Sequence, residues 1–114
     1  MNPLTLLLLL FASLGLLLVG IAIPLIQRRI RPNLWYGFRT KRTLNDPGVW
    51  YEANAYAGKR LLISGLITTG AAIVLYLIPN LTISGYTLGM TVFALGPLLV
   101  GVSQSFRYLN RLGG

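Results

Sequence analysis

The residues of this chain that could do chemistry lie almost entirely in residues 31–60, which read RPNLWYGFRTKRTLNDPGVWYEANAYAGKR. This stretch holds both acidic side chains of the protein, Asp46 and Glu52, and the whole sequence contains neither histidine nor cysteine. Two carboxylates make a poor metal site, and no thiolate or imidazole is present to act as ligand, base or nucleophile. We therefore expect no metal, no cofactor and no enzymatic activity, and we expect the two acids to form ion pairs within the surrounding basic loop.

The rest of the chain carries too little charge for a water-soluble globule. Of its 114 residues, 54% are hydrophobic and 11% are charged, whereas soluble domains have about 25% charged residues. The mean hydropathy is +0.68. A net charge of +8 would suggest nucleic-acid binding in a soluble protein. Here the basic residues border long apolar runs, so we expect anionic lipid headgroups as partners and no direct contact with nucleic acid.

Three apolar segments predict an all-α integral membrane protein, because about 20 apolar residues cross the hydrocarbon core as a helix. We expect one membrane domain, residues 1–114, with spans at about 4–26, 61–78 and 86–106. A cleaved signal peptide is the alternative for the first segment, but no positive side chain precedes it, so we expect it to be retained. An earlier start for the second helix is also encoded, since Asn45 or Asp46 can cap a helix whose first residue is Pro47.

The positions of lysine and arginine predict the orientation. Eight of the ten basic residues lie between the first two spans, and Arg107 and Arg111 follow the third. The positive-inside rule then places the loop, about 27–60, and the C-terminus in the cytoplasm, with the N-terminus outside. Three arginines directly after the first span are interpreted as an orientation signal that also contacts lipid: Arg28, Arg29 and Arg31. The predicted spans contain no ionisable residue, which disfavours a coupled transporter.

Small residues recur along the spans at helical spacing. Three sets have a spacing of seven residues, and a fourth is a GxxxG pair: Ser13 and Gly20; Gly58, Gly65 and Ala72; Gly89 and Gly96; Gly85 and Gly89. Such stripes allow helices to approach closely in lipid. We expect them to pack the three helices on one another, and contacts in a homo-oligomer are the alternative.

The loop has a more ordered composition than a connector needs. Its segment PNLWYGFRTKRTLNDPGVWYEANAYAGK resembles the signature of the SdpI family of bacterial membrane immunity proteins, in which Asn, Gly-x-Arg-Thr, Thr-Leu, Trp and Gly-Lys follow in order. The residues that fall on this pattern are Asn33, Gly37, Arg39, Thr40, Thr43, Leu44, Trp50, Gly58 and Lys59. Lys41 departs from it, at a place where proline is frequent. The chain is thus identified as a short, three-span member of the family.

The resemblance implies a multi-pass protein of the bacterial cell membrane that gives immunity to a secreted peptide toxin. It also implies a relay, in which a cytoplasmic repressor is held at the membrane when toxin is sensed. Arg39 and Thr40 are interpreted as a contact surface for a peptide or a regulator, and the alternative is a loop arginine that bonds to local carbonyl groups or lipid phosphate. Trp50 is interpreted as an interfacial anchor, or alternatively as a cation–π partner of Arg39. A small accessory subunit of a larger membrane complex is the alternative function, and a transporter or membrane enzyme has the least support.

Overall fold

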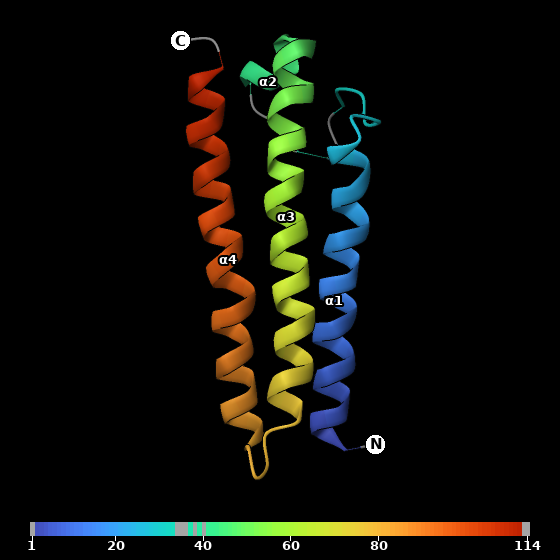
Figure 1. Ribbon diagram of the computed structural model, residues 1–114, viewed down its shortest axis with the longest axis vertical. Coiled ribbons are helices and arrows are strands. Elements are labelled where there is room, and N and C mark those ends of the chain that lie inside the picture. Colours follow the sequence, from blue (N-terminus) through green and yellow to red (C-terminus); the bar gives the residue numbers. More distant parts are fainter. Residues whose placement is uncertain (1, 34–36, 38, 40, 113–114) are drawn as a thin grey trace.

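The computed structural model describes residues 2–33, 37, 39 and 41–112, and its described part is helical without strands (Figure 1). The elements are α1 (Pro3–Ile26), α2 (Lys41–Asn45), α3 (Pro47–Tyr76) and α4 (Ile83–Arg111). The three long helices are each long and apolar enough to cross a membrane. The predicted all-α fold with three candidate spans is therefore confirmed.

The central helix of the bundle is α3, which packs against both α1 and α4, whereas α1 and α4 have little contact with each other. The N-terminus lies at one end of the bundle, and the loop after α1, α2 and the C-terminal end of α4 lie at the other (Figure 1). We call this second end the basic end, because the basic loop and the C-terminal arginines meet there. The three predicted crossings require this arrangement, and the side of the membrane on which the basic end lies stays a prediction.

Side-chain caps define where the long helices begin. Asn2 accepts a hydrogen bond from the amide of Leu4 at 2.9 Å. Asp46 accepts from the amides of Gly48 and Val49. Of the two predicted caps for α3, Asp46 is thus the correct one, with Pro47 at the first helical position. The helix has 30 residues, or about 45 Å at 1.5 Å per residue, because it starts well before the apolar run.

The closest approach in the bundle is between α1 and α3. A Cβ added to Gly65 would lie 2.6 Å from the carbonyl oxygen of Gly15, and one added to Gly58 would lie 3.1 Å from that of Ala22. Ala72 continues this buried face of α3. The predicted stripe of Gly58, Gly65 and Ala72 therefore packs inside the bundle, as small residues do where backbones meet.

The predicted stripe of Ser13 and Gly20 on α1 does not pack against the other helices of the bundle, and its alternative role in a homo-oligomer stays a prediction. Ser13 is exposed, and nothing lies within 4 Å of a Cβ added to Gly20. The face of α1 that meets α3 carries Gly15 and Ala22 instead, which have the same spacing but lie two residues further along the helix. Gly96 of α4 also faces open space.

The end of the bundle opposite the basic end has its own small core. Tyr86 and Met90 of α4 are buried with Ala72, and the Tyr86 hydroxyl donates to the Ala72 carbonyl oxygen at 3.0 Å. The outer surface is apolar, with large side chains such as Leu10, Val74 and Leu88 more than half exposed. An exterior of this kind suits hydrocarbon rather than water, as expected for a multi-pass membrane protein.

Candidate functional site at the basic end

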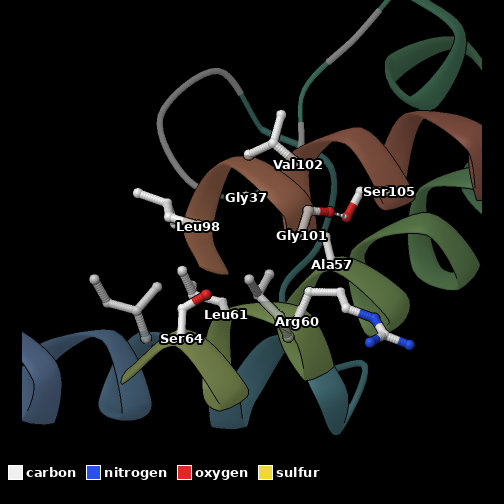
Figure 2. A pocket seen from close by; sticks show the side chains of 11 residues that line it. Gly37, Ala57, Arg60, Leu61, Ser64, Leu98, Gly101, Val102 and Ser105 are labelled. Carbon is white, nitrogen blue, oxygen red and sulfur yellow. Dashed lines mark hydrogen bonds between the residues drawn. The ribbon is translucent and has the colours of Figure 1, made fainter. Parts of the chain in front are cut away.

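A cavity of about 280 Å³ lies between the three long helices near the basic end (Figure 2). All three helices contribute apolar side chains to its wall: Ile21, Leu25, Leu61, Leu98 and Val102. Arg60, Ser64 and Ser105 supply polar atoms, and Gly37 of the loop also lines it. Loop and bundle thus share one cavity, which is apolar except for a few convergent polar groups, as ligand sites commonly are.

Arg60 stands between α3 and α4 at this cavity. A Cβ added to Gly101 would lie 3.0 Å from the Arg60 Cβ, so glycine at 101 lets α4 lie close to the arginine. The guanidinium carbon lies 5.1 Å from the centroid of the Tyr56 ring, a cation–π distance. The Arg60 Nε is buried and has no hydrogen-bond partner among the described residues.

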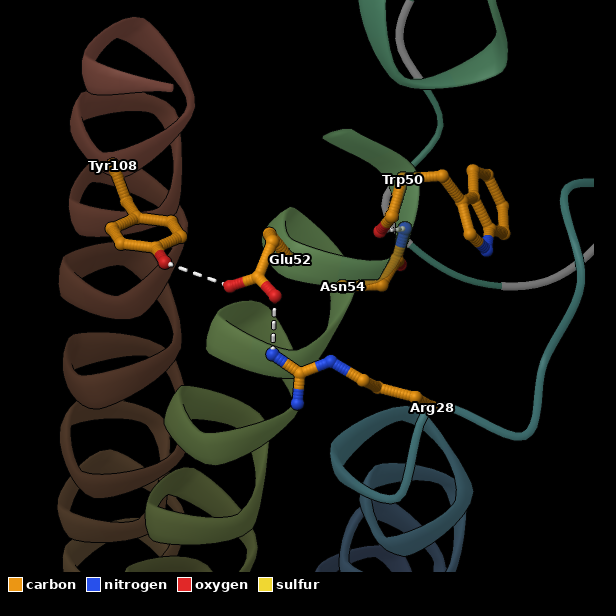
Figure 3. Close-up of polar contacts among 5 residues, drawn as sticks. All are labelled: Arg28, Trp50, Glu52, Asn54 and Tyr108. Carbon is orange, nitrogen blue, oxygen red and sulfur yellow. Dashed lines mark hydrogen bonds and ion pairs between the residues drawn. The ribbon is translucent and has the colours of Figure 1, made fainter. Parts of the chain in front are cut away.

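The tyrosine next to Arg60 belongs to a contact between α3 and α4. The rings of Tyr56 and Tyr108 are stacked, with centroids 4.3 Å apart and planes inclined by 8°. The Tyr108 hydroxyl donates to Oε2 of Glu52 at 3.4 Å (Figure 3). Aromatic and polar contacts therefore fasten α4 to the first turns of α3.

Glu52 connects this contact to the end of α1. Its Oε1 pairs with Nη2 of Arg28 at 2.6 Å (Figure 3), and Arg28 has a φ of 59°, outside the helix. The side chains are 48% and 46% exposed, so the pair by itself adds little stability. The prediction that Glu52 pairs with a loop cation is confirmed, whereas Asp46 caps α3 instead.

The protonation state of Glu52 follows from this pairing. The hydrogen bond from Arg28, and then its charge, hold the pKa of the Glu52 carboxyl below its usual value, while partial desolvation opposes the shift. Glu52 precedes the uncharged run that begins at Leu61, so it belongs to the polar part of α3. It is a carboxylate at neutral pH and, from α3, accepts hydrogen bonds from Arg28 beyond the end of α1 and from Tyr108 of α4.

Trp50 holds the loop from inside the protein. Its side chain is fully buried, and its indole Nε1 donates to the carbonyl oxygen of Ile30 at 2.8 Å. The structure adds a role that neither sequence interpretation contained: the ring is buried inside the protein, and its indole nitrogen bonds to the backbone after α1. Arg39 is exposed, and among the described residues a cation–π pair joins Arg60 to Tyr56 instead.

Asn54, one turn after Trp50, is a buried residue that sequence reasoning missed. Its Nδ2 donates to the Trp50 carbonyl oxygen at 3.0 Å (Figure 3). Gly37 approaches it so closely that an added Cβ would lie 2.7 Å from the Asn54 Oδ1, and its φ is +104°. Glycine at 37 is thus required by both space and backbone conformation. The sequence carried one signal for Asn54: it is a polar residue four positions after Trp50, and residues at this spacing share a helix face.

The residues 29–105 match the family model described as the SdpI/YfhL protein family. The chain belongs to this family. It is also 37% identical, over 62 residues, to a protein of Bacillus subtilis (strain 168) named Uncharacterized protein YfhL. The aligned part is 54% of this chain and 56% of the relative, so the match spans little more than half the length of either. No solved structure matches the chain. The SdpI/YfhL family is one of membrane immunity and signalling proteins and is not a known family of enzymes.

The SdpI/YfhL motif residues divide into an inner and an outer group. Thr43, Trp50 and Gly58 are buried and shape the loop and the packing of α3. Arg39 and Lys59 are exposed, so a partner can reach them. Asn33 is half-buried and donates to the Arg31 carbonyl oxygen at 2.8 Å.

The remaining predicted site residues are placed as follows. Thr40 lies outside the described residues. Of the three arginines in the orientation signal, Arg29 and Arg31 are exposed at the basic end, and Arg28 binds Glu52. The predicted contact residues on the surface are therefore basic.

Proposed function

We propose that this chain gives the cell that makes it immunity to a secreted peptide toxin, and that it relays the presence of toxin by holding a cytoplasmic repressor at the membrane. The observation that carries the proposal is the position of the SdpI/YfhL motif. Its buried residue Trp50 bonds to the chain after α1 at Ile30, and its loop residue Gly37 lines a cavity together with the three long helices. Loop and bundle are thus parts of one site.

The surface of the basic end supports binding of an acidic segment. Arg29, Arg31, Arg39 and Lys59 are exposed there, and an arginine presents five donors in a fixed fork that suits carboxylates. A peptide or repressor segment rich in Asp or Glu would be complementary to it.

Contacts between the helices at the same end of the bundle support the relay. Glu52 of α3 binds Arg28, beyond the end of α1, and Tyr108 of α4. A toxin that moves one helix relative to another would strain these bonds and shift the loop. The relay thus needs no contact between toxin and repressor.

Expression in toxin-sensitive cells tests the proposal. We expect wild-type protein to raise survival against one member of a panel of secreted peptide toxins, and Arg39→Ala to lose this protection. Arg111→Ala is the matched control, because Arg111 is an exposed arginine of the same end outside the family motif.

Two outcomes would contradict the proposal. One is wild-type protein that protects against no peptide and, with a photo-crosslinker at position 39, captures no regulator. The other is a stoichiometric larger membrane complex recovered in native detergent without any protection, which would indicate the accessory-subunit function.

A further inference from the structure

Arg60 occupies the border between the polar and the uncharged parts of the bundle. It is the last charged residue of α3, and the next charged residue along the chain is Arg107. Arginine at such a border extends its charged group toward the lipid headgroups while its aliphatic stem remains in apolar surroundings. A basic side chain at this border of a spanning helix is long enough to reach headgroup phosphates.

The chain offers Arg60 no carboxylate side chain as counterion. Its acidic side chains are Asp46 and Glu52; Asp46 caps α3, and Glu52 binds Arg28. The Arg60 Nε is buried without a hydrogen-bond partner among the described residues, and the Tyr56 ring supplies a neutral face. Arg60 is half-buried, and a cation that is partly withdrawn from water without an anion loses solvation, so an anion from outside the chain would offset this loss.

The cavity next to Arg60 suits a hydrocarbon chain. Leu25, Leu61, Leu98 and Val102 line it, and its volume of about 280 Å³ is too small for a folded partner. Its α4 wall continues into lipid-facing surface, since Val102 is 45% exposed and the neighbouring Leu99 is 64% exposed. A ligand that fits both features is apolar in its chain and anionic in its head.

We propose that Arg60 and this cavity form a binding site for one anionic phospholipid. An acyl chain fills the cavity, and the headgroup phosphate binds the Arg60 guanidinium, as arginine does in bidentate pairs. The bilayer presents this ligand at the height of Arg60 and against the exposed side of α4. The site is independent of toxin and repressor, so it stands or falls separately from the proposed immunity.

Native mass spectrometry tests the site. Protein is extracted from vesicles of equal parts phosphatidylglycerol and phosphatidylcholine, and bound lipid is counted. We expect one retained phosphatidylglycerol on the wild type, and roughly tenfold less retention on Arg60→Gln, because a charge-assisted hydrogen bond is lost. Arg107→Gln, which removes an exposed arginine of the same end, should retain lipid as the wild type does, and Arg60→Lys should retain an intermediate amount.

A second variant tests the cavity while keeping the arginine. Ala57 lines the cavity, and Ala57→Leu should expel the acyl chain and lower lipid retention to the level of Arg60→Gln. Gly70→Leu is the matched control on the same helix, because nothing lies within 4 Å of a Cβ added to Gly70. Circular dichroism and thermal unfolding in detergent verify that each variant is folded.

Four results would overturn the site. They are wild-type protein without preference for phosphatidylglycerol, equal losses in Arg60→Gln and Arg107→Gln, full retention by folded Ala57→Leu, and a co-purified peptide in place of the lipid. Glycerol 3-phosphate carries the phosphate of a lipid headgroup but no acyl chain, so competition with it tests whether the site binds a lipid or a free phosphate. We expect it not to displace the lipid at millimolar concentration, and displacement would show that the acyl chain adds nothing.

Discussion

The indole Nε1 of Trp50 donates a hydrogen bond to the carbonyl oxygen of Ile30 at 2.8 Å. A residue of the family motif in the first turn of α3 thereby holds the chain just after it leaves α1. Since Trp50 is fully buried, its contribution is internal: it ties the chain at Ile30 to the first turn of α3.

Trp50→Phe should release this part of the loop while keeping most of the packing. Loss of one buried hydrogen bond should lower the free energy of unfolding by about 1 kcal/mol, and Trp50→Ala by about 3–5 kcal/mol. Unfolding in detergent measures the stability, and protease cleavage within residues 31–40 measures the loop. Tyr51→Phe, at the neighbouring half-buried position, is the control, and equal cleavage of Trp50→Phe and wild type would contradict the assignment.

Gly37→Ala should disturb the same loop from its other side. The added methyl would lie 2.7 Å from the Asn54 Oδ1 at a φ of +104°, and such a backbone conformation costs a side chain about 1–2 kcal/mol. We expect faster loop cleavage and a lower unfolding temperature. At Gly48 an added Cβ would meet its nearest neighbour at 3.4 Å, so Gly48→Ala should behave as wild type; a stable, uncleaved Gly37→Ala would refute the close contact.

Gly65→Ala should separate α1 from α3. Its Cβ would lie 2.6 Å from the carbonyl oxygen of Gly15, and a backbone atom cannot rotate away as a side chain can. Overpacking of this kind costs about 1–3 kcal/mol. Gly96→Ala provides the comparison, because it adds the same methyl to a glycine that faces open space. The unfolding temperature should fall for Gly65→Ala alone. Equal unfolding temperatures for the two variants would show that α1 and α3 lie further apart than this contact requires.

Acid should weaken the link made by Glu52. The pKa of the Glu52 carboxyl is lower in the folded protein than in the unfolded chain. Between these two values, the upper of which is about 4.3, the unfolded chain therefore binds more protons than the folded protein. The stabilisation is complete above that pH and is lost as the pH falls through the folded pKa. The effect is small, because both partners are about half exposed. Glu52→Gln and Arg28→Gln should both reduce the difference in unfolding temperature between pH 7 and pH 3, and unchanged differences would rule out the pair.

Local signals made much of the fold predictable from the sequence. Apolar runs determine the long helices, and the cap at Asp46 depends on its neighbours Pro47 and Gly48. The pairing of Glu52 was predictable as well, since one of few acids among many cations finds a partner.

The rest depends on how the helices are rotated about their axes. Ser13 and Gly20 have the same spacing as Gly15 and Ala22, and only packing decides which pair faces α3. Arg60 likewise resembles the other basic residues of the loop until its place beside the cavity is known. The partner of Trp50 is a backbone carbonyl, which any residue at position 30 would supply and no sequence pattern marks.

The central position of α3 has a consequence for biosynthesis. A nascent chain emerges N-terminus first, so α1 enters the bilayer before its packing partner exists, with the Gly15 face turned to lipid. Because α1 and α4 have little contact with each other, α4 does not replace α3 as the packing partner of α1. Translation of α3 is thus the step that brings α1 its packing partner in this bundle, and α4 then packs against the other side of α3.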